Sequence, residues 1–290
     1  MWGVRLLIVL AAAAALAPTA AAAAPRVYVA SDPAYSVAFA EEGGQVSLLG
    51  LDTKRFCGYT EPTEPQKPRP YRPLAAPLPM RASPTGLIAT VDESEMLGPA
   101  RLALAANFSA TALSGEFTYE ADEGPSYRCQ SGTYYPGTAA VPFEAVPYVR
   151  FGEPGAATPA ADEAPDYFGR KGPLEVFIRT EGGVATVRGA VVSKCRFGGD
   201  RKSTRAPLFG VPYAFKLDGK ASFSRQFKKN AGRVKGDVVT EVTRISAKVG
   251  EAAISGSYFR SATTGEGASA RKCTIGPLRF RADRYLPPAA

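Results

Sequence analysis

Histidine is missing from the 290-residue sequence. Its absence excludes Ser-His and Cys-His nucleophilic catalysis and the common zinc sites that use histidine ligands. It also removes the side chain that most often serves as a general acid or base near neutral pH. We therefore expect a protein that is not an enzyme and that has no metal site and no cofactor.

Long apolar runs are missing from the chain after residue 24. Residues 1–24 place Arg5 before the run LLIVLAAAAALA and end in small residues, which is the pattern of a secretory signal peptide. The alternative is an N-terminal membrane anchor, which Pro18 and the weak hydrophobicity of alanine disfavour. We expect a secreted protein, extracellular or loosely associated with the cell envelope, with no transmembrane segment after removal of the signal.

Two segments of the sequence each occur twice, in the same order. The segment FAEEGGQVSLLGLDTKRFC (39–57) matches FIRTEGGVATVRGAVVSKC (177–195), and ALSGEFTYEADEGPSYRCQSG (112–132) matches AISGSYFRSATTGEGASARKCTIG (253–276). An internal repeat of this kind indicates a duplicated unit. We interpret the second segment as two late strands around a variable hairpin, ending at a cysteine.

Cysteine is scarce, with four residues and no CxxC pair. In an exported chain this favours disulfides over metal binding or catalysis. Of the three connectivities, duplication favours the one that closes each copy on itself, Cys57 with Cys129 and Cys195 with Cys273. The two intervals are 72 and 78 residues, and such a loop stabilises the fold by roughly 4 kcal/mol on the chain-entropy estimate.

The sequence predicts no amphipathic helix after the signal, because no long stretch has an apolar stripe of helical period bounded by helix caps. Apolar residues alternate instead, as in RVKGDVVTEV, where Val238, Thr240 and Val242 share one face and Asp237 and Glu241 the other. The segment LEVFIRTEGGVATVRG reads as two strands around a Gly-Gly turn.

We predict an all-β fold made of two tandem antiparallel β-sandwich or β-barrel domains, each closed by one disulfide. The first domain spans residues 25–151 and contains a proline-rich insert at 61–86, expected to be an extended excursion or loop. A linker at 152–173 leads to the second domain, residues 174–290.

The charge is divided unevenly between the two copies. Residues 25–166 contain 10 Lys and Arg against 18 Asp and Glu, whereas residues 167–290 contain 24 against 9. The basic half suits an anionic polymer or an acidic protein surface as its partner, through a salt-sensitive attraction. The candidate polyanion-binding residues are Arg201, Lys202, Arg205, Lys228, Lys229, Arg233, Lys235, Arg271 and Lys272. A further cluster near the C-terminus comprises Arg279, Arg281 and Arg284.

Two alternatives to polyanion binding remain open. The charges can simply be solvated, or the acidic copy can contact the basic copy, within one chain or head to tail between chains. Acidic groups at 92–95 and 120–124 also invite a calcium site or a carboxylate-based polysaccharide hydrolase, although the pattern favours a solvated loop at a hairpin tip. Sugar binding would depend on Tyr59, Tyr71 and the pair Tyr134 and Tyr135, because the single tryptophan, Trp2, lies in the signal.

Each copy resembles small secreted two-cysteine β-domains. The resemblance rests on the aromatic residue and Gly-Gly near the start, the mid-domain Ser-Gly followed by aromatics, and the late Cys-x-x-Gly. Such domains occur among uncharacterised proteins of high-GC actinobacteria, whose alanine and arginine richness this chain shares. The resemblance covers Tyr35 to Gly137 and Pro173 to Ala282, and it implies a β-fold and export but no activity. The sequence thus predicts an exported, non-enzymatic binding or structural protein, with self-association or polysaccharide hydrolysis as alternatives.

Overall fold

The chain adopts an all-β fold. The computed structural model describes residues 24–59, 67–95, 98–109, 111–122, 126–134, 137–159, 166–193, 204–208, 212–217, 222–234, 237–264 and 271–289. In the N-terminal half the strands are β1 (Arg26–Asp32), β2 (Tyr35–Glu42), β3 (Gln45–Tyr59), β4 (Arg69–Tyr71), β5 (Leu78–Pro79), β6 (Arg81–Ser83), β7 (Gly86–Glu95), β8 (Gly98–Phe108), β9 (Leu113–Asp122), β10 (Tyr127–Gln130) and β11 (Val141–Arg150). In the C-terminal half they are β12 (Asp166–Lys171), β13 (Leu174–Glu181), β14 (Val184–Ser193), β15 (Thr204–Pro207), β16 (Tyr213–Lys216), β17 (Ser222–Val234), β18 (Asp237–Val249), β19 (Ala253–Thr264) and β20 (Arg271–Leu286).

All the described strand pairs are antiparallel, and the order of paired strands differs between the two halves. In the N-terminal half the pairings form a closed circuit, β1–β2–β3–β10–β9–β11 and back to β1, with β8 and β7 continuing from β9. In the C-terminal half the described pairings run in an open series from β14 through β13, β12, β20, β19 and β18 to β17. The two halves are joined by a short β11–β20 ladder.

The two Gly-Gly hairpins have the same geometry. Gly43 and Gly44 have φ angles of 58° and 77°, and Gly182 and Gly183 have 54° and 73°. Two consecutive positive φ angles are what a two-residue hairpin of type I′ requires, and glycine adopts them without a steric penalty. The predicted turn at Gly182 is therefore confirmed, with β13 and β14 on either side of it.

The layers of the molecule form a stack with apolar side chains between each pair. One cluster of buried side chains lies between β1–β3 and the sheet of β7–β9, including Phe39, Leu48, Leu104, Phe117 and Tyr119. A second lies between β12–β14 and the sheet of β17–β20, including Val176, Ile178, Ile245, Tyr258 and Phe280. A third joins the middle layers, through Val27, Val29, Ala38, Ala40 and Leu49 on one side and Phe168, Phe177 and Tyr285 on the other.

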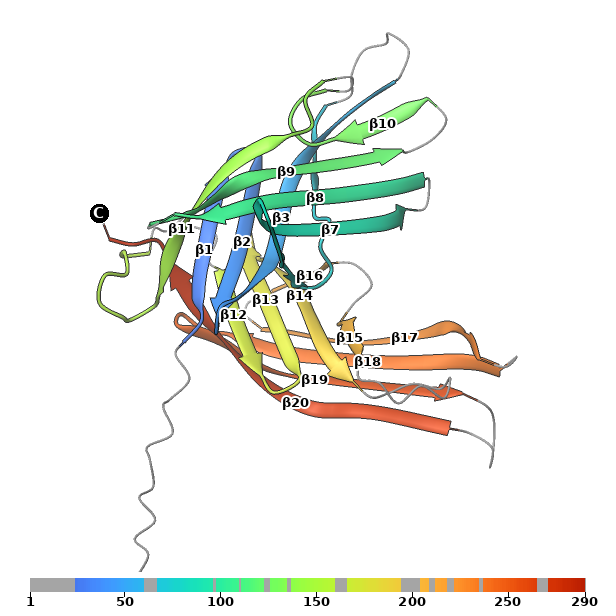
Figure 1. Cartoon of the computed structure of the whole chain (residues 1–290). Helices are drawn as coiled ribbons and strands as arrows, with labels where there is room; N and C mark the ends of the chain where they lie inside the picture. Colours follow the sequence, from blue (N-terminus) through green and yellow to red (C-terminus); the bar gives the residue numbers. More distant parts are fainter. Residues whose placement is uncertain are drawn as a thin grey trace, which may run out of the picture.

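Strands β1–β3 are consequently buried on both faces, which explains why their apolar runs are nearly continuous. Figure 1 shows these layers in order, with the sheet of β7–β9 at one end of the stack and the sheet of β17–β20 at the other. Both end sheets extend in the same direction from the middle of the molecule (Figure 1). Their outward faces are therefore the two ends of a four-layer stack.

A group of buried and half-buried charges joins the middle layers. The Asp52 carboxylate on β3 accepts hydrogen bonds from Arg188 and Arg179 of the C-terminal half, the Arg179 contact measuring 3.3 Å, and it lies 3.1 Å from Arg72 Nε. Arg188 is fully buried; burial lowers its pKa, an effect that Asp52 opposes. Burial would also lower the pKa of Arg179, but Asp166 at 2.5 Å outweighs it and the pKa is raised.

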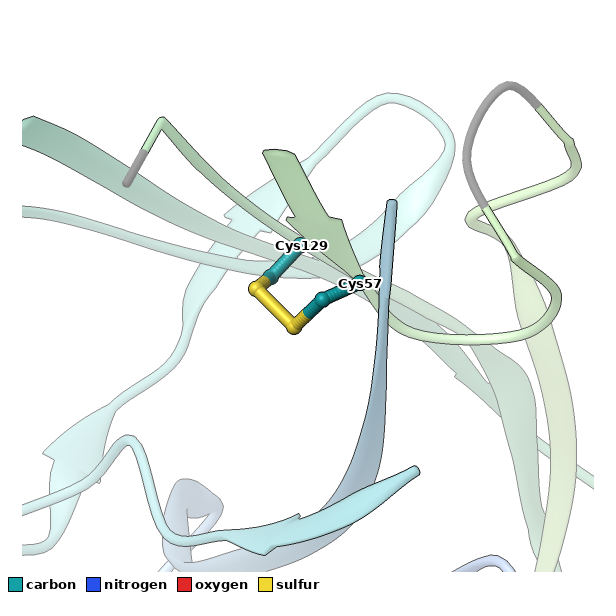
Figure 2. The surroundings of a disulfide bond; sticks show 2 residues. All are labelled: Cys57 and Cys129. Atoms are coloured by element: carbon teal, nitrogen blue, oxygen red, sulfur yellow. A yellow bond between two sulfur atoms is a disulfide. The ribbon is translucent and has the colours of Figure 1, made fainter. Parts of the chain in front are cut away.

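The disulfide between Cys57 and Cys129 bridges directly opposed residues of β3 and β10, as predicted. Figure 2 shows the two sulfur atoms on the same side of this strand pair, and both residues belong to the buried cluster of the N-terminal half. Cys273, on β20, is also disulfide-bonded. Cys195, its predicted partner, lies outside the described residues.

Two segments contain more regular structure than the sequence led us to expect. Residues 152–173, predicted as a linker, include β12, because Tyr167 and Phe168 are buried apolar residues that pair with β13 and β20. In the proline-rich insert, β4 and β5 pair with β3, and Leu74 is buried in the core. Prolines limit these strands to two or three residues but do not prevent edge pairing. Residues 61–66 of the insert lie outside the described part of the chain.

Candidate anion-binding face

The sheet of β17–β20 separates its side chains cleanly into an inward and an outward face. Phe223, Ala247, Gly256 and Phe280 lie side by side across the four strands and face the core. Because side chains alternate along a strand, residues one position away in each strand face solvent. Ser224, Ser246, Ser257 and Arg279 form such an outward row.

Exposed basic side chains are distributed over this outward surface, which we call the basic face. It contains Lys228, Arg244, Lys248, Lys272, Arg279 and Arg281, all exposed. Among the described outward residues of these strands, Asp283 at the edge is the one carboxylate, and it accepts a hydrogen bond from Arg281 Nε at 2.7 Å. The surface therefore combines an open β-sheet face with a strong local positive charge, which attracts anions over a distance that depends on the salt concentration.

Hydroxyl groups lie between the cations. A shallow depression of about 460 Å³ is lined by Ser222, Phe223, Ser224, Ser246, Ala247, Lys248, Ser255, Gly256, Ser257 and Arg279. Ser246 and Ser257 share a hydrogen bond of 3.1 Å across β18 and β19. Hydroxyls can donate to or accept from a ligand, so together with Lys248 and Arg279 they can bind an oxyanion without a deep pocket.

Arg244 is held in place by its neighbours on the face. Its Nε donates to Gln226 Oε1 at 2.6 Å, and its guanidinium group lies 5.3 Å from the centroid of the Phe259 ring. Such cation–π packing fixes the side chain and leaves part of the guanidinium edge open to a ligand. Two neighbouring side chains therefore orient Arg244 on the basic face.

On β18, a charged residue of the alternating pattern faces inward and an apolar residue faces outward. Glu241 is 6% exposed and pairs with Arg260 at 2.8 Å, while its apolar neighbour Val242 is half-buried on the outward side. A period of two distinguishes the two faces of a strand but does not say which one turns inward. Nearby, burial raises the pKa of Tyr258 to about 12.

The structure brings only some of the predicted polyanion-binding residues onto this face. Lys228 and Lys272 are exposed there. Arg205, Lys229, Arg233 and Arg271 lie on β15, β17 and β20, where only their backbone positions are described, and Arg201, Lys202 and Lys235 lie outside the described residues. Of the C-terminal cluster, Arg279 and Arg281 belong to the face, whereas Arg284 is buried beside Phe151.

Arg244 and Lys248 belong to the basic face but to none of the basic clusters predicted from the sequence. Each is a single cation separated from the next by one or more residues, so neither forms part of a cluster in the sequence. The period of two along β18 places both residues on one face of the strand. The cross-strand register then aligns Arg244 with Gln226 and Lys248 with Ser222. Periodicity within a strand is thus a better guide to this surface than contiguous charge.

The sheet of β7, β8, β9 and β11 has the same cross-strand register with the opposite charge. Its inward row is Leu87, Ala106, Gly115 and Phe143, which matches the row that runs from Phe223 to Phe280. Its exposed outward carboxylates, which we call the acidic face, are Asp92, Glu116, Glu120 and Glu144. The outward cations on this side include Arg101, which lies 3.8 Å from Asp92, and the exposed Arg81 on β6, which pairs with Ile88 of β7.

Several of the acidic residues and tyrosines singled out in the sequence contact residues of neighbouring strands. Asp122 forms a 2.8 Å ion pair with Arg128. Tyr71 packs on Tyr119 with ring centroids 4.6 Å apart, and Tyr134 packs edge-on against Phe56. Tyr59 is 44% exposed and stacks beside Tyr127, while Tyr135 lies outside the described residues.

Within the described ranges, no group of three or more Cys, Asp or Glu side chains could hold a metal ion. In the same part of the chain, no helix has the length and apolar character needed to cross a bilayer. The structure thus offers one strongly charged surface at each end of the stack. Comparison with protein families, with curated proteins and with solved structures finds no match.

Proposed function

We propose that the protein is an exported, non-enzymatic binding protein whose basic face holds an anionic polymer or an acidic protein surface. The observation that carries this proposal is the set of six exposed cations on the outward side of one sheet, where Asp283 at the edge is the one carboxylate among the described residues. Clustered charge of one sign raises the local concentration of an oppositely charged partner and accelerates its association. Export is supported by the Cys57–Cys129 disulfide, since such bonds persist in oxidising compartments.

The finer architecture belongs to the same proposal. We infer two β-units derived from one duplicated sequence, with the acidic unit in the N-terminal half and the basic unit in the C-terminal half. Three matches support the duplication: the Gly-Gly hairpins have similar φ angles, the inward rows share one register, and Cys129 and Cys273 both lie opposite an alanine, Ala121 and Ala262. A single ancestral unit can then diverge in charge while it retains its strand register.

The proposal is tested by titrating the protein with linear polyphosphate at several salt concentrations. We expect binding at about 10 mM salt, where the Debye length is about 30 Å. The logarithm of the association constant should fall with the logarithm of the salt concentration with a slope of roughly −4, as about six contacts to a flexible polyanion predict. Neutralising two cations, in Lys248→Gln/Arg279→Gln, should make this slope about one third shallower.

The matched control neutralises two exposed carboxylates of the other end sheet, in Glu116→Gln/Glu144→Gln, and should retain the slope of the parent protein. Both double variants change only exposed side chains, so circular dichroism should show unaltered folds. Absence of binding at low salt would contradict the proposal, as would an equal loss of slope in the two double variants.

A further inference from the structure

The acidic and basic faces are counterparts built on one pattern of strand pairing. Asp92 follows Leu87 by five residues on β7, and Lys228 follows Phe223 by five on β17; Leu87 and Phe223 begin the matching inward rows. In the same way Glu144 follows Phe143 and Arg281 follows Phe280 at the other end of those rows. Two sheets of the same register therefore present opposite charges at corresponding positions.

These two faces cannot meet within one chain. The acidic sheet packs inward on β1–β3, the basic sheet packs inward on β12–β14, and the third apolar cluster joins the two middle layers. The outward faces therefore lie at opposite ends of the stack, as Figure 1 shows. A partner for either face has to come from another molecule.

We propose that the anionic partner of the basic face is the acidic face of a second copy of this chain, so that copies associate head to tail. This inference rests on the proposed function, because it assigns an occupant to the same basic face. Such a contact uses two different surfaces, so each added copy leaves one acidic and one basic face free. The product is an open chain of stacked molecules.

The size of the faces indicates how strong the contact is. Four strands spaced about 4.8 Å apart and about ten residues long cover roughly 19 Å by 33 Å, or about 600 Å² per partner. The total of about 1,200 Å² is at the lower limit for specific interfaces. Since the attraction is largely electrostatic and solvent-exposed, we expect reversible association that increases with protein concentration and is lost in high salt.

Sedimentation velocity on the purified full-length protein tests this inference. At about 10 mM salt the average mass should rise with protein concentration, and at about 500 mM salt, where the Debye length is only a few ångströms, it should fall to that of the monomer. Two charge-reversed variants sharpen the test: Glu116→Lys/Glu144→Lys on the acidic face and Lys248→Glu/Arg279→Glu on the basic face. Each variant alone should remain monomeric at low salt, whereas an equimolar mixture of the two should associate.

The equimolar mixture of the two charge-reversed variants is the decisive experiment, because two misfolded variants would not restore association when mixed. A monomeric parent protein at low salt and high concentration would overturn the inference, and so would association that persists in either variant alone. Polyphosphate binding separates this result from the proposed function. A monomer that binds polyphosphate through its basic face would leave the proposed function standing and remove the self-association, and a monomer that does not bind would remove both.

Discussion

Three arginines converge on the carboxylate of Asp52. Arg188 and Arg179 donate hydrogen bonds to it from the C-terminal half, and Arg72 approaches to 3.1 Å from its own half. Arg188 also donates from Nε to the backbone carbonyl of Leu74 at 3.2 Å. Because Arg188 is fully buried, its positive charge depends on Asp52 for neutralisation, and removing a buried partner costs far more than removing an exposed one.

Replacing Asp52 with asparagine should therefore lower the free energy of unfolding by about 3–5 kcal/mol. The matched control is Asp92→Asn, which breaks a 3.8 Å pair with Arg101 whose side chains are 80% and 67% exposed and should cost below about 1 kcal/mol. Urea denaturation of the parent and both variants measures the difference. Equal losses in the two variants would show that the Asp52 cluster does not hold the halves together.

At the scale of the strand, the glycine of each Ser-Gly phrase sits where no side chain fits. A Cβ atom on Gly256 would lie 2.4 Å from the carbonyl oxygen of Ser246, and one on Gly115 would lie 2.0 Å from that of Ala105. Ser246 and Ala105 occupy corresponding positions on β18 and β8. The repeated phrase thus records a close approach of two strand backbones, made once in each end sheet.

Gly256→Ala should destabilise the protein by about 1–3 kcal/mol, because the new methyl group must displace the backbone of β18 or the Phe280 ring. Ser255→Ala, one residue earlier on the exposed side of β19, is the control and should change stability by less than about 0.5 kcal/mol. The midpoint of urea denaturation reports both effects. A neutral Gly256→Ala would mean that the sheet relaxes at this position.

Patterns that are local to a strand were predictable from the sequence. The Gly-Gly hairpins, the strands that contain Cys129 and Cys273, and the all-β class follow from turn residues and a period of two. The prediction that the second of these strands ends at its cysteine is wrong, because β20 continues from Cys273 to Leu286. The inward turn of Glu241 was not predictable, because it depends on Arg260 on a neighbouring strand. For the same reason Arg244 and Lys248 emerge as site residues only once the register places them on the same outward side as the cations of neighbouring strands.

Across the whole molecule, the halves are bound together by more than a connecting segment. The third apolar cluster, the charges around Asp52 and the β11–β20 ladder all join residues of one half to residues of the other. The backbone amide of Gly189 also donates to the carbonyl of Ala75 at 3.2 Å. A rigid connection of this kind keeps the acidic and basic faces at a fixed spacing, which a regular head-to-tail chain of copies requires.

The shared middle core predicts that the two halves unfold as one unit. Differential scanning calorimetry at high salt, where we expect the protein to be monomeric, should show a single transition whose calorimetric and van't Hoff enthalpies agree. Unfolding one half alone would expose the buried faces of Phe168, Phe177 or Leu49 to water, and this penalty couples the halves. Two resolved transitions in the parent protein would contradict the coupling, since tandem domains joined only by a linker unfold independently.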